Sequence, residues 1–109
     1  MISDRWDVVL VPFPFTEAPG AKRRPALALS NPAFNRSGHT VLAMITTREH
    51  NPWPGDTEIE HHRAAGLPLR CLVRLNLFTL DNHLILRRLG SLAPSDAARV
   101  EHNFTRYLP

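Results

Sequence analysis

Arginine dominates the basic side chains of this sequence, and its chemistry suits phosphate groups. It supplies twelve of the thirteen basic residues, and Lys22 is the only lysine. A guanidinium binds a phosphate through two hydrogen bonds and stacks on a base, which an ammonium does poorly. A GC-rich genome favours arginine codons and would give the same composition. Composition alone therefore leaves both nucleic-acid binding and codon bias open.

Histidine and cysteine are the other side chains here that bind metals or move protons. The six histidines include no pair at the i, i+4 spacing of a helical zinc motif, and Cys71 is the only cysteine. We therefore expect no metal site and no cofactor, and we expect Cys71 to pack as a small apolar residue. A histidine general base stays open, because histidine titrates near neutral pH. His50 and His61 flank a predicted loop, and nothing selects between them.

The length and composition of the chain predict one cytoplasmic domain. With 109 residues, of which 43% are hydrophobic, and a formal charge of +3, we expect a single domain over residues 1–109. No stretch approaches the roughly 20 apolar residues that span a bilayer, and no apolar signal core follows the first residues. One cysteine cannot form an internal disulfide. We expect a protein of the reducing cytoplasm with no membrane partner.

Short apolar runs predict a mainly β protein. Ten prolines argue against a helical bundle, and apolar, β-branched segments between polar stretches are typical of strands. We expect exposed loops at 14–24 and 48–55, a polar connection at 35–39 and one helical turn at 61–65. The expected strands cover residues 8–13, 26–30, 41–46, 57–60, 71–75 and 77–80, with a last strand or turn at 84–90.

The C-terminal segment alone has helical spacing. Pro94 suits the first turn of a helix, and Asp96 favours the positive end of its dipole. We predict a helix over residues 94–107 that packs on the sheet. Several short strands and one terminal helix favour a small, curled antiparallel barrel. The face that would pack carries Ala97, Val100, Phe104 and Leu108.

Five short patterns follow one another along the chain. An acidic residue opens the first strand, an Arg-Pro pair opens the second, the third ends in two threonines, a later strand pair contains an arginine, and a proline starts the helix. These patterns lie at residues 7–11, 24–30, 44–47, 72–81 and 92–94. In this order and spacing they resemble the MazF/PemK family of bacterial toxins over nearly the whole chain.

The resemblance implies a fold, an activity and a set of partners. The fold would be an SH3-like barrel with a C-terminal helix, paired as a homodimer. The activity would be sequence-specific, metal-independent cleavage of single-stranded RNA, which leaves a 2′,3′-cyclic phosphate and a 5′-hydroxyl. The partners would be RNA and a cognate antitoxin with an acidic C-terminal tail, and operator DNA would be contacted only through the antitoxin. Arg24 and Thr46 would form the core of the site.

Arg24, Thr46 and Arg74 are the candidate catalytic residues. Cleavage by the 2′-hydroxyl of RNA needs a base, cationic donors for the charge that builds on phosphorus, and an acid for the leaving oxygen. Arginine stays protonated, so we assign Arg24 to charge stabilisation. The Thr46 hydroxyl can donate to a phosphate oxygen. Arg74 is either a second cationic donor or one half of a surface ion pair.

Further residues are candidates for binding RNA. Two of them form the basic end of the first long loop, two are polar neighbours of the catalytic candidates, and two are loop aromatics that can stack on bases. These residues are Phe15, Lys22, Arg23, Thr47, Trp53 and Asn76.

Two departures from the family pattern keep other functions open. Trp6 stands where the family has glycine before the first acid, and Asn76 stands where one branch has an aspartate proposed as the general base. An asparagine cannot take that proton, so a relative that has lost catalysis and only binds RNA or antitoxin is one alternative. A CcdB-like toxin that binds gyrase is the other, although this chain ends in Tyr107-Leu108-Pro109 and not in the Trp-Gly-Ile of that group.

Overall fold

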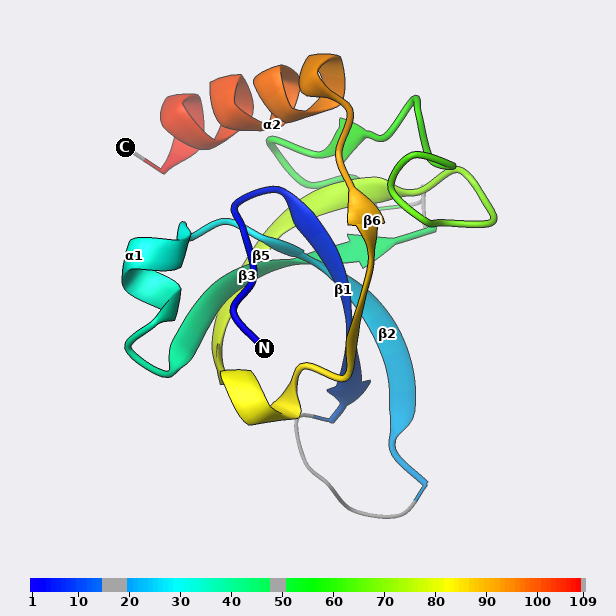
Figure 1. Cartoon of the computed structure of the whole chain (residues 1–109). Coiled ribbons are helices and arrows are strands. Elements are labelled where there is room, and N and C mark those ends of the chain that lie inside the picture. Colours follow the sequence, from blue (N-terminus) through cyan, green and yellow to red (C-terminus); the bar gives the residue numbers. More distant parts are fainter. Residues whose placement is uncertain (15–19, 48–50, 109) are drawn as a thin grey trace.

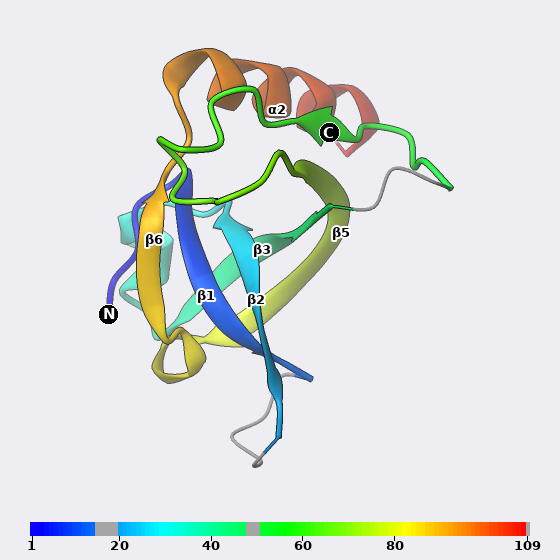
Figure 2. The same cartoon turned by 90° about the vertical axis from the view of Figure 1, so that its right-hand side faces the viewer.

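An antiparallel six-stranded sheet forms the body of the computed structural model, which describes residues 1–14, 20–47 and 51–108. The strand order is β4-β5-β3-β2-β1-β6. The long strands curl into a half-barrel, and one helix lies across its upper end (Figures 1 and 2). The predicted mainly β fold is therefore confirmed. The strands are β1 Asp7–Phe13, β2 Lys22–Ala28, β3 His39–Thr46, β4 Thr57–Glu58, β5 Leu72–Asp81 and β6 Arg87–Ser91.

The central strands are buried on both faces, which explains their continuous apolar runs. In β1, Val8 packs into a first core cluster beneath the C-terminal helix, whereas Val9 and Val11 pack into a second cluster on the other face. Successive side chains of a strand point to opposite faces. Leu27 of β2 joins the first cluster, and its neighbour Ala26 joins the second. Strands covered on both faces lose the polar alternation of half-exposed strands.

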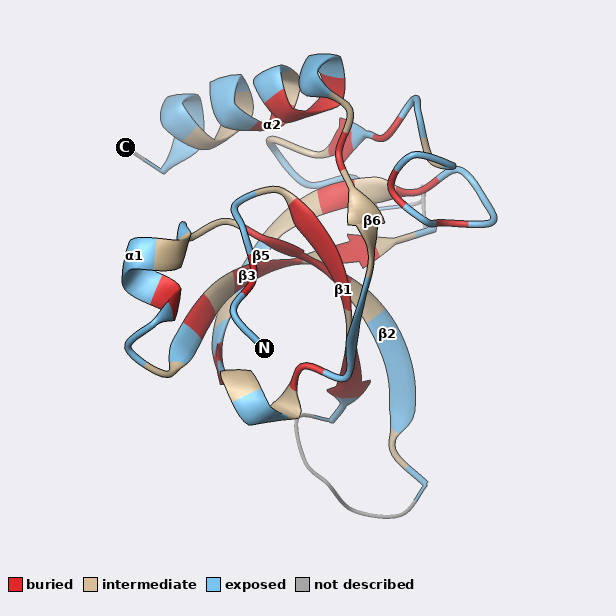
Figure 3. Ribbon diagram, in the orientation of Figure 1, coloured by how far each residue is buried: buried red, intermediate tan, exposed pale blue. Residues whose placement is uncertain are grey.

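The C-terminal helix α2 spans Pro94–Tyr107, as the sequence predicts. Ala97 and Val100 are buried in the first core, but Leu108 is 40% exposed, so the packed face is shorter than predicted. Figure 3 shows the buried stripe where α2 begins. Neither this helix nor any other in the described ranges is long and apolar enough to cross a membrane.

Several predicted boundaries are wrong. β2 begins at Lys22, so residues 22–24 belong to a strand and not to the loop. A short helix, α1 Pro32–Asn35, precedes the expected polar connection; the Asn31 side chain caps it by accepting from the Phe34 amide. A 3₁₀ turn, η1 Asn82–Leu84, follows β5. The expected helical turn at 61–65 is a hydrogen-bonded turn without helix.

The predicted break at Asn76 is a bulge within one long strand, β5. Ala43 of β3 pairs with Leu77 and Met44 pairs with Arg74, so Leu75 and Asn76 have no partner on β3. Because two residues are inserted, the alternation of side chains is the same before and after the bulge. Asn76 therefore points to the same face as Arg74.

Trp6 occupies a backbone conformation that favours glycine, with φ at 77°. Its amide donates to Ala28 (2.8 Å) and its carbonyl accepts from Leu92 (3.0 Å). The ring is half-buried against the first core, and the Arg5 guanidinium lies 4.4 Å from its centroid. This geometry accounts for the glycine that the resemblance implies here, and it shows that the indole packs on the fold.

Gly66 and Gly38 allow the cost of close packing to be separated from the cost of backbone strain. Both have positive φ, but a Cβ at Gly66 would lie 2.0 Å from the Leu89 carbonyl oxygen, whereas one at Gly38 would meet nothing within 4 Å. We expect Gly38→Ala to cost about 1 kcal/mol of unfolding free energy and Gly66→Ala at least about 3 kcal/mol. Urea unfolding followed by circular dichroism measures both, and equal losses would contradict the close approach.

Candidate active-site groove

A groove of about 660 Å³ opens beside the second core cluster, on the face of the sheet that β1, β2, β3 and β5 share. It brings together residues from three separate segments of the chain, all of which the sequence predicted to act on RNA. Arg24 comes from β2, Thr46 ends β3, and Asn76 sits in the β5 bulge. The remaining lining residues are Phe13, Pro25, Met44, Ile45, Thr47 and Cys71.

Strand alternation explains why these side chains meet. Val9 and Val11 continue to Phe13 on one face of β1, and Ala26 is preceded on the same face of β2 by Arg24. Met44 lies opposite Ala26 in the β2–β3 register. The second core cluster therefore ends where the groove begins, because on this face β2 changes from Ala26 to Arg24 and β3 changes from Met44 to Thr46.

Arg24 lies on a part of β2 that extends past β3. β2 pairs with β1 from Lys22 to Leu27, but with β3 only over residues 26–28. The exposed first half of β2 is visible in Figure 3. The Arg24 guanidinium lies 5.8 Å from the centroid of the Phe13 ring. None of the described residues that line the groove is acidic, so among these residues the positive charge of Arg24 has no neighbouring carboxylate in the groove wall.

Arg74 shares the face of the groove but turns its guanidinium to Asp56. Nε donates to Oδ1 (3.1 Å) and Nη2 donates to Oδ2 (2.9 Å), and the two side chains are only 12% and 13% exposed. The hydrogen bond to Asp56 raises the pKa of Arg74 above its usual value. The Trp53 ring centroid lies 5.3 Å from this guanidinium, and the Trp53 amide also donates to Asp56 (2.9 Å). The sequence left Arg74 between a cationic donor and an ion pair, and the structure shows the ion pair.

Cys71 packs as the sequence predicts. It is 8% exposed, belongs to the first core cluster and borders the groove. Burial raises the pKa of its thiol above the usual value, so the neutral form dominates at neutral pH. None of the described histidines lines the groove: His39 contacts Asp81 (3.1 Å) and His62 Nδ1 bonds the Leu67 carbonyl (2.8 Å). His50 lies outside the described residues.

The remaining predicted RNA contacts divide into two groups. Thr47 lines the groove and is exposed, whereas Lys22 and Arg23 are exposed on β2 without lining it. Alternation puts Arg23 on the face opposite Arg24. Trp53 is 43% exposed, and its ring lies against the Arg74 guanidinium. Phe15 lies outside the described residues.

Phe13 and Met44 are groove residues that sequence analysis missed. Each belongs to an apolar run that was assigned to the core. The position of Phe13 in its strand was the available signal. Phe13 follows Val9 and Val11 on the same face of β1, but it lies just beyond the buried part of that strand. Within the described ranges, no three His, Cys, Asp or Glu side chains gather closely enough to hold a metal ion.

Comparison with known families decides the family of the chain. The family model of PemK-like, MazF-like toxins of type II toxin–antitoxin systems matches residues 4–108. The chain belongs to this family. It is therefore a type II toxin of the MazF group, as the sequence patterns indicated.

Solved structures of MazF proteins share the fold. A MazE–MazF complex from Deinococcus radiodurans superposes with a TM-score of 0.77 at 24% identity, over 99% of this chain and 97% of that one. An endoribonuclease from a mycobacterial species gives 0.76 at 19% identity, over 97% and 90%. A mycobacterial endoribonuclease in complex with its cognate antitoxin gives 0.72 at 22% identity, over 96% and 91%. Comparison with curated protein sequences gives no match.

The Asp56–Arg74 pair of this MazF-family toxin should be strongly coupled. Removing either partner leaves the other charge largely buried and unpaired. A double-mutant cycle with Asp56→Asn and Arg74→Gln should therefore give a coupling free energy of about 1–3 kcal/mol. The exposed Arg5–Glu101 pair, 3.3 Å apart and 42% and 55% exposed, is the matched control and should give about 0.5 kcal/mol or less. Urea unfolding of the wild type, the four single variants and the two double variants measures both cycles. Similar couplings in the two pairs would show that burial adds nothing at Asp56.

Proposed function

We propose that this toxin is an endoribonuclease that cuts single-stranded RNA without a metal ion. The observation that carries the proposal is the convergence of Arg24, Thr46 and Asn76 on one groove, whose described lining residues include no carboxylate. A phosphodiester is attracted to such a groove and is repelled by acidic ones. The solved mycobacterial relatives of this fold are named endoribonucleases, which supports the same activity here.

The proposed reaction is an internal transfer within RNA. The 2′-oxygen bonds to phosphorus, the bond from phosphorus to the 5′-oxygen breaks, and the products are a 2′,3′-cyclic phosphate and a 5′-hydroxyl. A base takes the 2′-proton and an acid gives one to the leaving oxygen. Because nucleophile and phosphate belong to one molecule, holding them in line supplies much of the rate.

Arg24 would stabilise the charge that builds on the phosphoryl oxygens. Its guanidinium stays protonated, so it is a permanent positive charge and a poor proton donor. The hydroxyl groups of Thr46 and Thr47 would donate to the same oxygens. The Asn76 amide can hold the ribose or phosphate but cannot take a proton. The predicted donor role of Arg74 would depend on its Nη1 group, since Asp56 takes Nε and Nη2.

RNA binding would extend on both sides of the groove. Phe13, 42% exposed, and Trp53 present aromatic faces on which bases can stack. Lys22 and Arg23 would contact phosphates at the projecting end of β2, where they are exposed. The predicted stacking by Phe15 remains a prediction, because that residue lies outside the described ranges.

The proposed partners follow the same logic. An antitoxin with an acidic C-terminal tail would compete with RNA for the basic end of β2 and the groove, and operator DNA would be reached only through that antitoxin. Solved relatives include MazE–MazF complexes. The proposed compartment is the cytoplasm, where both messenger RNA and antitoxin would be available.

Arg24→Ala should abolish RNA cleavage and leave the fold intact. Removing one preorganised donor of transition-state charge costs about 10²–10³ in rate, and Arg24 carries a full charge. Arg24→Lys should restore little, because an ammonium lacks the planar fork of donors. Single-turnover cleavage of one short RNA in EDTA, with circular dichroism on each protein, measures the effect.

Two companion variants sharpen this experiment. Arg36→Ala removes an exposed arginine that does not line the groove: it caps α1 just before β3 begins, whereas the groove lies where β3 ends, and this variant should cut like wild type. Asn76→Asp should raise the rate if an aspartate base fits this groove. Arg24→Ala cutting within about threefold of wild type would remove Arg24 from the site. Intact RNA with the wild-type protein would favour the decayed alternative.

We also propose a homodimer. A domain of this size buries a limited core, and ten large apolar side chains are exposed in the described part of the chain, among them Phe34 and Leu77. Pairing with a second copy would remove some of this surface from water. Light scattering at micromolar concentration should give twice the 12.3 kDa mass of one chain. A monomer mass that persists as concentration rises would refute the dimer.

A further inference from the structure

A second hollow of about 260 Å³ adjoins the groove. Thr47 and Cys71 line both spaces, so the two are neighbours along the surface. The volume is below the roughly 300–1,000 Å³ of pockets that enclose drug-sized ligands, which leaves room for a group the size of one nucleobase. Its remaining lining residues are Pro52, Asp56, Glu58, Arg70 and Leu72.

The charges of the hollow differ from those of the groove. In the part of the chain that the structure describes, two carboxylates line the hollow and none lines the groove. Asp56 is engaged by Arg74 and by the Trp53 amide. Glu58 and Arg70 form an exposed ion pair, with side chains 50% and 64% exposed. Exposed ion pairs contribute little stability, so a ligand that satisfies both groups can compete with it.

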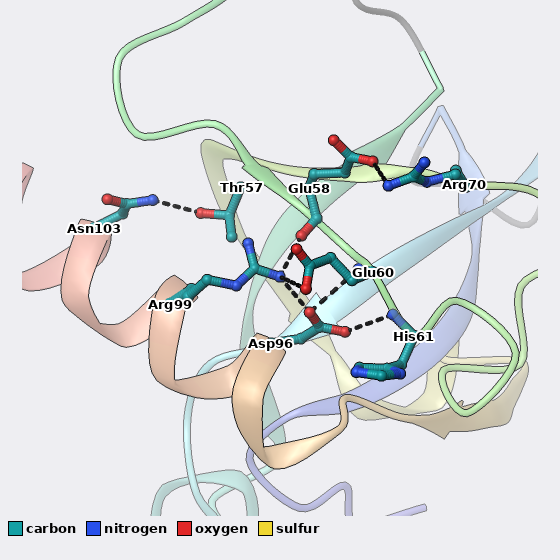
Figure 4. Close-up of polar contacts among 8 residues, drawn as sticks. All are labelled: Thr57, Glu58, Glu60, His61, Arg70, Asp96, Arg99 and Asn103. Atoms are coloured by element: carbon teal, nitrogen blue, oxygen red, sulfur yellow. Dashed lines mark hydrogen bonds and ion pairs between the residues drawn. The ribbon is translucent and has the colours of Figure 1, made fainter.

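Helix α2 holds the backbone that carries Glu58 (Figure 4). The Arg99 guanidinium donates to the Glu58 carbonyl (2.8 Å), and the Asn103 amide donates to the Thr57 hydroxyl (2.7 Å). The buried Asp96 carboxylate accepts from the backbone amides of Glu60 (3.2 Å) and His61 (2.9 Å). The main chain around Glu58 is thus fixed from the helix side, while its carboxylate meets Arg70 on the other side.

We propose that this hollow binds a guanine base of the RNA, next to the phosphate held in the groove. The proposal rests on the proposed function. Guanine offers two donor groups, N1–H and N2–H₂, beside two acceptors, O6 and N7. Glu58 would accept from the donors and Arg70 would donate to the acceptors. Cytosine offers only one donor group, and adenine and uracil match the pair less well. Glu58 and Arg70 would therefore set the base preference of cleavage.

The same charges argue against other occupants. A phosphate in the hollow would face the carboxylates of Asp56 and Glu58, and so would the side chains of an acidic antitoxin tail. A base carries no net charge and presents donors as well as acceptors. The basic groove would thus hold the phosphate. The hollow, which has both acidic and basic side chains, would hold the base of a neighbouring nucleotide.

The test separates base preference from activity. Wild type, Glu58→Gln and Arg70→Gln are incubated with a long RNA, and the fragment ends are mapped. Wild type should cut with guanine at one fixed position, and each variant should lose roughly tenfold or more of its preference for guanine over adenine there. Glu60→Gln and Arg63→Gln are matched controls: both residues are exposed, neither lines the hollow, and their products should keep the wild-type pattern.

Binding gives a second readout that does not need catalysis. Short RNAs with a 2′-deoxy sugar at the cleaved position, carrying guanine or adenine at the tested site, are titrated against the same proteins. Glu58→Gln should bind the two RNAs equally, whereas Glu60→Gln should still favour guanine. Circular dichroism confirms folding, and Arg70→Gln serves if Glu58→Gln is unfolded.

The outcomes distinguish the two proposals. If the wild type does not cleave RNA but still prefers guanine in binding, the proposed endoribonuclease activity is refuted and the proposed guanine site stands. Cleavage without guanine preference, or an identical preference in Glu58→Gln and Glu60→Gln, would refute the hollow alone. Weaker binding of an acidic antitoxin-tail peptide by Arg70→Gln, with base preference unchanged, would assign the hollow to the antitoxin and overturn the proposal.

Discussion

Strand register is the constraint on which the rest of this structure depends. The central strands bury side chains on both faces, so each register that fills the first core also determines what lies on the second face. A slip of one residue in β2 would exchange Leu27 with its neighbours and turn Arg24 away from the groove. No further interaction is therefore needed to bring the catalytic candidates together. The packing that stabilises the sheet also places Arg24 and Thr46 in the same groove.

Helix α2 performs the corresponding task for the short edge strand. β4 has two residues and pairs only with β5, which is too little to fix a loop by sheet hydrogen bonds alone. The carboxylate of Asp96 is fully buried and binds two backbone amides of the following segment, so α2 supplies the missing contacts. The C-terminal helix thus connects the core to the wall of the second hollow, although no predicted site residue lies on it.

Sequence patterns predicted the helix and strands in which burial is periodic. They failed where a single contact determines the local structure. Periodicity and the proline at its start located α2, and periodicity found the apolar strands, because burial imposes a pattern there. It missed α1, which depends on one Asn31 cap, and it read the β5 bulge as a break. For the site, the resemblance selected Arg24, Thr46 and Asn76, which the structure gathers in one groove. The pairing of Arg74 with Asp56 links residues 18 apart and leaves no local signal.

The β5 bulge has a consequence for how this strand can change length during evolution. Loss of Leu75 and Asn76 together would return β5 to an ordinary ladder with every flanking side chain on its present face. Loss of either one alone would leave one extra residue, and β5 would need a one-residue bulge there to keep Val73 in the core. Loss of the pair is thus the change that needs no bulge. Relatives that differ by such a pair would keep the toxin fold while gaining or losing one wall of the groove.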